Sequence, residues 1–440
     1  MPTDAQGRQK ITGEIQIPSQ LVEEHKGKIT NLSHLRSTLQ KAESEGVTSV
    51  LDVLLISILS LDASDIHIEP EEKSAKIRLR IDGMLQDLMS FPRDLYETIL
   101  SRVKLVSGIK LNVTSKPQDG RFSFTLSNEE PVESRVATLP SEYGESVVLR
   151  ILNPKNLMTL ENLGLRQDLL TLLKRELKKP NGMILATGPT GSGKTTTLYA
   201  CLKEINKPEI KIVTIEDPIE YHLGGVSQTQ VHPEKGYDFP SGLQAIVRQD
   251  PDVILVGEIR DSETAQIALQ AALTGHLVFS TLHTNDAAGT ITRFISLGAK
   301  PINIAAACNF VIGQRLARKV CGKCATFTKI TDAEFEKIKR GVGGIKGISV
   351  PKILPTMELA RIKGCAECNN TGYRGRIGIF EAIAVDHEME EYILATPSIG
   401  ALEKFAIKKG MITMYQDGLL KVVERITTFE EIERVTGEDI

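Results

Sequence analysis

The chain has 440 residues, which is more than a single core usually supports. Its content of 41% hydrophobic and 25% charged residues is ordinary for a globular protein. Its 53 basic and 56 acidic residues leave a net charge of −3, which offers no electrostatic footprint for bulk nucleic-acid binding. The absence of Trp and an aromatic content of 5% leave few side chains on which single-stranded bases stack. We therefore expect about two to four domains and no specific nucleic-acid partner.

The N-terminal part of the sequence is polar. Residues 1–46 are weakly patterned and predict a tether or the remnant of a larger region. No basic stretch followed by an apolar run is found at the N-terminus, so we expect no secretory signal. Residues 47–61 carry Val, Leu and Ile at helical spacing but include Asp52, which predicts a helix facing a core rather than a membrane span.

Residues 47–152 predict a first α/β domain. Residues 65–69 and 76–81 alternate polar and apolar side chains, which is typical of half-buried strands, and Asp82-Gly83 predicts a hairpin turn. A helix is expected near 93–107. The remaining strands of this domain are expected at 121–126, 133–138 and 146–152. Pro154, Asn156 and Gly164 indicate a linker over 153–164.

A second α/β domain is predicted over residues 165–312. Four apolar strands separated by helical stretches indicate a mainly parallel sheet with helices on both faces. These strands are expected at 183–187, 211–216, 252–256 and 277–281. A cysteine-bearing module over 313–382 and a helical region over 383–440 complete the chain.

The most informative motif is a glycine-rich loop between an apolar strand and a helix. It reads Gly188, Pro189, Thr190, Gly191, Ser192, Gly193, Lys194 and Thr195, with Thr196 next in the helix. Such glycines let backbone N–H groups converge on phosphate oxygens at a helix N-terminus. Lys194 would reach the β- and γ-phosphates, and the Thr195 hydroxyl would help to hold Mg²⁺. The sequence therefore predicts binding of a nucleoside triphosphate.

Polar residues follow three further strands of this domain, where open α/β sheets place their active sites. They are Glu216 with Asp217 and Glu220, then Glu258 in Val256-Gly257-Glu258-Ile259-Arg260-Asp261, then His283 in Ser280-Thr281-Leu282-His283-Thr284. Each taken singly is equally consistent with a solubilising carboxylate or a structural histidine. Together, beside a phosphate loop, they predict a catalytic site.

The phosphate loop, the segments that carry Glu216 and Glu258, and the segment around His283 occur in this order. We call residues 280–286, which end in Asn285-Asp286, the histidine box. Together these motifs resemble those of the type II secretion and type IV pilus assembly ATPases. The resemblance covers residues 47 to the C-terminus. It implies ATP and Mg²⁺ as ligands and a RecA-like domain preceded by a smaller, PAS-like α/β domain. It also implies that Glu258 positions or activates water, that Glu216 binds Mg²⁺ or shares that role, and that His283 senses the γ-phosphate.

The resemblance further implies a hexamer in which each nucleotide lies between the two α/β domains. An arginine from the first domain would then stabilise the charge that develops during phosphoryl transfer. We expect Arg135 and Arg150 to be these arginine fingers, with Arg121 as the runner-up. Solvated arginines on a sheet face are the alternative.

Four of the six cysteines form two CxxC pairs, Cys321 with Cys324 and Cys365 with Cys368, separated by 40 residues. Two such pairs predict a structural zinc site, because four thiolates leave no open coordination position. A dithiol redox role does not account for two copies. A helix is expected near 332–340 between the pairs. Cys201 and Cys308 lie in apolar stretches that we interpret as helical, packed as small hydrophobic side chains.

Basic residues gather near the cysteines in the sequence and suggest contact with anionic lipid or an acidic loop, with a solvated surface as the alternative. They are Arg315, Arg318, Lys319, Lys323, Arg374 and Arg376.

The resemblance implies a cytoplasmic ATPase, peripheral to the inner membrane, that assembles a pilus or pseudopilus. It would act with a membrane platform protein and a cytoplasmic-face adaptor. A pilus retraction motor, a nucleic-acid-translocating ring ATPase and a catalytically silent scaffold stay open as alternatives. Members of this family that drive retraction resemble the rest of the chain but lack the cysteine pairs.

Overall fold

The computed structural model describes residues 13–127, 129–154, 157–348 and 350–437. Residues 1–12 of the expected tether and Asn156 of the expected linker lie outside the described residues. The chain divides into two units: the first holds the chain up to Pro154 with Lys363–Arg374, and the second holds Lys155–Ile362 with Gly375–Ile440. Within the described ranges, no helix is both long enough and apolar enough to cross a membrane.

The first unit is built on a sheet in the order β1-β5-β6-β7-β2-β3-β4, antiparallel except that β1 pairs parallel to β5. Its strands are β1 Glu14–Ile17, β2 Ala63–Pro70, β3 Ser74–Ile81, β4 Met84–Pro92, β5 Gln118–Leu126, β6 Val132–Ser141 and β7 Gly144–Leu152. Asp82 and Gly83, both with positive φ (51° and 82°), form the predicted turn between β3 and β4.

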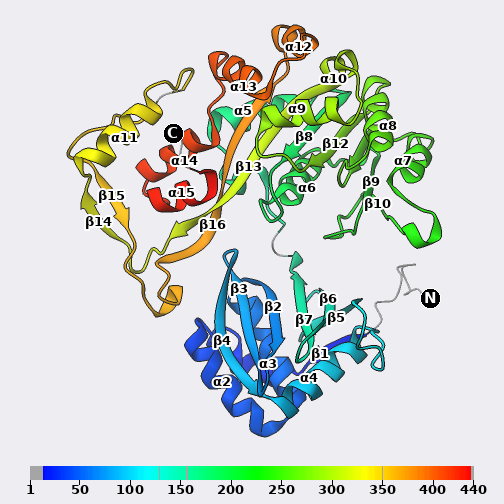
Figure 1. The fold of residues 1–440 in the computed structure, drawn as a ribbon, viewed down its shortest axis with the longest axis vertical. Helices are drawn as coiled ribbons and strands as arrows, with labels where there is room; N and C mark the ends of the chain where they lie inside the picture. The colour runs from blue at the N-terminus through cyan, green and yellow to red at the C-terminus, as the bar shows by residue number, and fades with distance from the viewer. Residues whose placement is uncertain (1–12, 128, 155–156, 349, 438–440) are drawn as a thin grey trace. The chain divides into compact units, whose positions relative to one another are not determined.

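Helices of the first unit gather on one face of this sheet (Figure 1). They are α1 Ser19–His25, α2 Leu32–Glu45, α3 Val47–Ser60 and α4 Arg93–Val106. Helices α3 and α4 confirm the predictions over 47–61 and 93–107. Residues 14–45, expected to be an unpatterned tether, instead form β1, α1 and α2. The reason lies in α2, whose buried face is made by Leu32, Leu35, Leu39 and Ala42 at helical spacing, while polar side chains on the other face mask the pattern.

The second unit is built on a sheet in the order β10-β9-β11-β12-β8-β13-β16, in which the pairs from β10 to β13 are parallel. The predicted strands at 183–187, 211–216, 252–256 and 277–281 are β8 Gly182–Thr187, β9 Ile212–Glu216, β11 Val253–Val256 and β12 Leu277–Leu282. The other strands are β10 Ser227–Gln230, β13 Cys308–Val320 and β16 Tyr373–Ala384. The boundary expected between 312 and 313 falls inside β13, which belongs to this sheet.

Alternate side chains of this sheet point into two different cores. Met183 and Leu185 of β8 pack in one core, and Ile184 and Ala186 pack in the other. The first core contains α7 Phe239–Val247, α8 Ser262–Leu273, α9 Ala287–Ser296, α10 Pro301–Ala307, α12 His387–Leu394 and α13 Ile399–Lys408. The second contains α5 Gln167–Glu176, α6 Lys194–Ile205 and the 3-10 turn η2 Leu160–Leu163. The sheet is therefore covered by helices on both faces, as predicted (Figure 1).

A further core of the second unit includes Ala317 of β13 and Ile379 of β16. It includes α11 Asp332–Val342, the antiparallel pair β14 Thr326–Lys329 and β15 Glu358–Arg361, and the helices α14 Met414–Val423 and α15 Phe429–Thr436. Helix α11 confirms the one predicted near 332–340, and its start is a capping box between Thr331 and Glu334. The described ranges also contain two further short 3-10 turns, η3 Pro233–Lys235 and η4 Ala366–Cys368. Cys308 is buried as expected, but it begins β13 rather than lying in a helix.

Candidate functional site

The phosphate loop joins the buried strand β8 to α6, in the setting that the sequence predicts. Gly188, Gly191 and Gly193 have φ values of 146°, 79° and 89°, a region that favours glycine. A Cβ on Gly188 would lie 2.5 Å from the carbonyl oxygen of Gln314, so the loop passes β13 too closely for a side chain. Helix α6 starts at Lys194, and its first backbone N–H groups and dipole favour an anion at the loop.

Lys194 is buried at the base of this loop, with 8% of the residue exposed. Its Nζ donates hydrogen bonds to the carbonyl oxygens of Gly188, at 2.8 Å, and Pro189, at 3.2 Å. Burial lowers the pKa of Lys194 to about 8, opposed by the carboxylate of Glu258 and reinforced by the guanidinium of Arg315. An anion at the loop would therefore meet an ammonium group held by the loop itself.

The carboxyl ends of β11 and β12 bring Glu258 and His283 together. His283 Nε2 lies 3.3 Å from Glu258 Oε2, and Arg260 Nη2 lies 2.5 Å from Glu258 Oε1. The Glu258 side chain is 12% exposed, whereas that of His283 is 49% exposed. Because Glu258 also raises the pKa of Lys194, its carboxylate lies within electrostatic reach of the phosphate loop, and the His283 imidazole lies beside that carboxylate. Arg260 lies inside the motif that carries Glu258, but the motif alone predicted no role for it.

Glu216, at the end of β9, is buried in a hydrogen-bond network. Its Oε1 accepts hydrogen bonds from Thr214 Oγ1 at 2.6 Å and Gln228 Nε2 at 3.2 Å, and its Oε2 accepts one from Tyr199. Burial raises the pKa of Glu216, and the hydrogen bonds from Thr214, Tyr199 and Gln228 act against this rise. Both carboxylate oxygens are thus engaged by protein donors, which distinguishes Glu216 from the ion-paired Glu258.

Strand β13 contributes two residues that the sequence did not single out as catalytic-site residues. The Gln314 side chain is buried and its Nε2 donates to the carbonyl oxygen of Ser192 in the phosphate loop, at 2.7 Å. Arg315 Nη2 donates to the carbonyl oxygen of Asn285, in the turn that follows His283, at 2.7 Å. Burial lowers the pKa of Arg315, against the effect of Glu381 and Asp286. Only the pairing of β13 with β8 brings this strand to the loop, so no local pattern could have revealed it.

The expected arginine fingers lie in one row across the sheet of the first unit. Arg121, Arg135 and Arg150 are direct register partners on β5, β6 and β7, and the row continues through Asp65 on β2 to Arg80 on β3. Asp65 is buried, and its oxygens lie 2.9 Å from Arg150 Nε and 3.2 Å from Arg80 Nε. These residues share a face because partners in register point the same way. The row belongs to the first unit and the phosphate loop to the second.

The basic residues near the cysteines do not form one solvated cluster. Arg318 Nη2 and Nε both donate to Oε2 of the buried carboxylate of Glu431, at 2.7 and 3.0 Å. Arg374 pairs with Glu367 at 2.5 Å, and Arg315 reaches the Asn285 turn. Structural ion pairs and the contact with the Asn285 turn therefore account for three members of the group, which removes the basis for a lipid-binding patch made of all six.

The four paired cysteines converge. The sulfur atoms of Cys321, Cys324, Cys365 and Cys368 all lie within 4.8 Å of one another. Cys365 Sγ and Cys368 Sγ are 3.8 Å apart, which matches the edge of a tetrahedron with Zn–S bonds of about 2.3 Å (2.3 × 1.63 ≈ 3.8). Backbone N–H groups of Cys365 and Gly372 donate to Cys368 Sγ, both at 3.2 Å, as suits a thiolate. The donor set fits a closed tetrahedral metal site.

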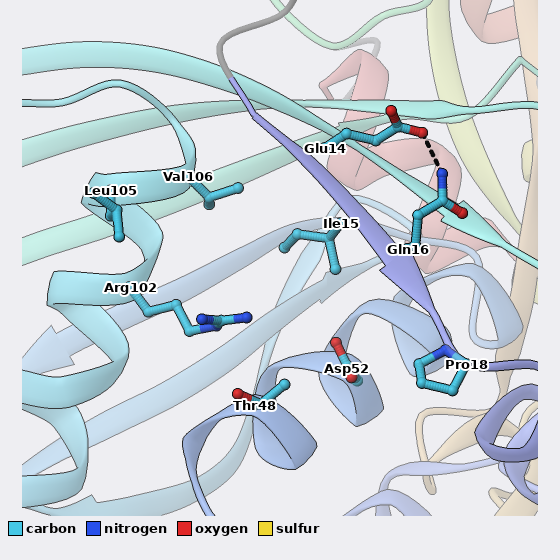
Figure 2. Close-up of a pocket in the computed structure, with 9 residues that line it drawn as sticks. All are labelled: Glu14, Ile15, Gln16, Pro18, Thr48, Asp52, Arg102, Leu105 and Val106. Carbon is cyan, nitrogen blue, oxygen red and sulfur yellow. Dashed lines mark hydrogen bonds between the residues drawn. The ribbon is translucent and has the colours of Figure 1, made fainter.

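The first unit also contains a cavity of about 370 Å³ between β1, α3 and α4 (Figure 2). Its lining consists of Glu14, Ile15, Gln16, Pro18, Thr48, Asp52, Arg102, Leu105 and Val106. Asp52 projects into it from α3, and Arg102 reaches toward Asp52 from α4 (Figure 2). Burial raises the pKa of Asp52 to about 6, although Arg102 lowers it. The cavity holds none of the residues that the phosphate-loop motifs predict.

A family described as Type II/IV secretion system protein matches residues 40–434. The chain is 44% identical to a type II secretion system protein E of Aeromonas hydrophila over 394 residues, covering 89% of this chain and 76% of the relative. It is 39% identical to a type IV pilus assembly ATPase, PilB, of Myxococcus xanthus, covering 90% of this chain and 69% of the relative.

Among solved structures, the pilus retraction motor PilT with bound ADP is similar with a TM-score of 0.59 and 27% identity, covering 88% of this chain and 96% of that one. The ATPase DotB of Legionella pneumophila has a TM-score of 0.63 at 22% identity, covering 87% of this chain and 94% of that one, a likeness of fold. The family match and the two curated relatives agree with the motifs at the sheet edge. The chain therefore belongs to the Type II/IV secretion system protein family, a family of ATPases.

Proposed function

We propose that this chain hydrolyses ATP to drive assembly of a type IV pilus or a type II secretion pseudopilus. The observation that carries the catalytic part is the Glu258–His283 pair beside a complete phosphate loop. The names of the two curated relatives support the assembly role, since one is a type II secretion protein E and the other a pilus assembly ATPase.

In the proposed reaction, ATP binds with its phosphates on the loop 188–193 and at the start of α6. Lys194 places its ammonium group on the β- and γ-phosphates, and Thr195 offers its hydroxyl to Mg²⁺. The bound Mg²⁺ supplies charge neutralisation. Glu258 orients the attacking water and accepts its proton, while His283, 3.3 Å from Glu258, responds to the γ-phosphate.

Glu216 remains a candidate for Mg²⁺ binding or for the general base. The hydrogen bonds that it accepts from Tyr199, Thr214 and Gln228 favour a supporting role, because a base needs a free lone pair toward the water. Glu258 is the stronger candidate for the base, since its partners Arg260 and His283 are themselves exposed side chains.

Arg135 and Arg150 are the proposed arginine fingers, with Arg121 as the runner-up. The row formed with Asp65 and Arg80 supports this assignment. The buried carboxylate of Asp65 binds the guanidinium of Arg150 and so orients it, although the neighbouring arginines of the row repel it. Such a concentration of guanidinium groups suits the charge of a phosphoryl group in transfer.

The proposed machine is a homo-hexamer in the cytoplasm, held at the inner membrane by a platform protein and a cytoplasmic-face adaptor. We further propose that the tetracysteine cluster holds a structural zinc ion. We further propose contact with anionic lipid at the exposed Lys319 and Lys323.

Retraction and nucleic-acid translocation are the competing functions. The likeness to PilT keeps a retraction motor open, while the tetracysteine cluster favours assembly. The net charge of −3 disfavours translocation of nucleic acid. Restored pilus or secretion in a strain lacking the gene would support assembly, loss of fibre disassembly would indicate retraction, and ATPase activity stimulated by DNA would indicate translocation.

The direct test of the catalytic proposal is the substitution Glu258→Gln. It removes the base but keeps the shape, so kcat should fall by about 100-fold or more while ATP affinity changes less than about threefold. The matched control is Glu263→Gln, an exposed carboxylate at the start of α8, which should leave both quantities unchanged. Hydrolysis by the Glu258 variant at the unaltered rate would contradict the assignment.

A further inference from the structure

Glu381, on β16, is a buried carboxylate that the proposed chemistry does not use. It is 4% exposed and accepts hydrogen bonds from two backbone N–H groups, that of Ala287 on Oε1 at 2.8 Å and that of Met414 on Oε2 at 3.2 Å. Ala287 is the first residue of α9, and Met414 is the first residue of α14. One side chain therefore joins the N-termini of two helices from distant parts of the chain.

The first of these helices begins directly after the histidine box. Its start is held from two other directions: Thr187 Oγ1 accepts the backbone N–H of Thr284 at 3.1 Å, and Arg315 donates to the carbonyl oxygen of Asn285 at 2.7 Å. Thr187 ends the strand before the phosphate loop. The turn that carries His283 is thus fixed against the loop on one side and against Glu381 on the other.

The second helix provides a rigid anchor. Asp417, one turn into α14, accepts the backbone N–H of Phe380 at 2.8 Å and hydrogen bonds from Lys421 at 2.6 Å and Arg166 at 2.7 Å. Phe380 precedes Glu381 on β16. The first residues of α14 are therefore hydrogen-bonded to two consecutive residues of β16, Phe380 and Glu381. These two contacts together fix the position of the α14 start relative to Glu381.

The space around Glu381 is closed as well. A Cβ on Gly313 of β13 would lie 3.0 Å from Cγ of Glu381 and 3.2 Å from the backbone nitrogen of Ala287. Only glycine lets β13 pass this carboxylate without displacing it. Burial raises the pKa of Glu381 to about 7, and the hydrogen bonds from Ala287 and Met414 act against this rise. The dipoles of both helices favour the charged form of this side chain, which offsets part of the cost of its burial.

We propose that Glu381 is a positioning residue for ATP hydrolysis: it fixes the His283 turn against α14, so that the imidazole stays beside Glu258. This inference rests on the proposed function. Glutamine cannot replace it fully, because its one amide oxygen serves one N–H while its NH₂ group meets the other. Aspartate is one methylene shorter and cannot span both helix starts.

The test compares the full chain carrying Glu381→Gln with the unaltered chain. Steady-state hydrolysis should show kcat lowered by at least about fivefold with KM for ATP within about twofold, because the phosphate loop is untouched. Hydrogen exchange of peptides covering 283–290 and 412–418 should accelerate by about tenfold or more. Glu391→Gln, an exposed carboxylate on α12, is the matched control and should change neither readout.

Gly313→Ala is the second variant, since it displaces the carboxylate without removing it. It should reproduce both effects, and its effect should be smaller in the Glu381→Gln background because the two changes act on one contact. A normal kcat in both variants, or unchanged exchange at 283–290 in both, would overturn the proposal. If the unaltered chain hydrolyses no ATP, the proposed function is wrong whatever Glu381 does. Hydrogen exchange of the peptides covering 283–290 then decides whether Glu381 holds this turn.

Discussion

Asp52 is an acidic residue within α3, a helix whose other members are mostly buried aliphatic side chains. Two effects compete on it: burial disfavours the charged form, and Arg102 across the cavity favours it. Burial is the larger, so the pKa is raised from 3.8 to about 6. A group whose folded pKa is raised holds its proton more tightly in the folded state. The contribution of Asp52 to stability therefore declines as the pH rises from about 4 to about 6 and is constant above.

From this sign we predict that Asp52→Asn stabilises the first unit at pH 7.5. The expected gain in the free energy of unfolding is roughly 1–3 kcal/mol, and it should shrink toward zero near pH 4. Thermal unfolding at several pH values measures it. Glu72→Gln, an exposed carboxylate between β2 and β3, is the control and should shift stability by less than about 0.5 kcal/mol. A loss of stability at pH 7.5 in the Asp52 variant would instead mean that the electrostatic attraction of Arg102 outweighs burial.

At the scale of elements, α2 shows how a helix can be hidden in a polar sequence. Asn31 caps it by accepting the backbone N–H of His34 at 2.9 Å, and its buried face packs on the core shared with α3 and the sheet. The helix is therefore a part of the first unit rather than an attachment to it.

We predict that Leu35→Ala, which removes a side chain with no exposed surface, destabilises the first unit by about 2–4 kcal/mol. Faster hydrogen exchange across α2, α3 and the neighbouring strands would reveal it. Gln40→Ala, on the exposed face of the same helix, should have little effect. If the Leu35 variant exchanged like the control, α2 would not be an integral part of this core.

At the scale of the whole molecule, the tetracysteine cluster joins segments that are far apart in the sequence. We predict that the purified chain carries about one zinc ion per protomer, and that Cys368→Ser loses it. The expected consequence is faster exchange in the segment between the cysteine pairs and a lower melting temperature. Cys201→Ala is the control, because Cys201 is buried in α6 away from the cluster and should leave the zinc content unchanged. Full zinc content in the Cys368 variant would exclude the assigned ligand set.

Local sequence patterns predict much of the fold. The alternation in β3, the Asp82-Gly83 turn and the apolar runs of β8, β9, β11 and β12 were each sufficient to place an element, because each depends on neighbours in the sequence. Strands β13 and β16 were missed. Their side chains mix buried and exposed positions without strict alternation. Strand β13 pairs with β8, more than 100 residues earlier, and β16 lies next to β13 in the sheet.

By itself, the sequence determined that this chain has a phosphate loop, acidic and histidine-bearing strand ends and two cysteine pairs, because these motifs depend on residue type at short spacing. Only the tertiary structure decided which of these groups meet. It set Glu258 beside His283, enclosed Glu216 among Tyr199, Thr214 and Gln228, and brought Glu381 to the helix start that follows the histidine box. The physical reason is that such contacts follow from strand order and burial, which join residues that no local spacing relates.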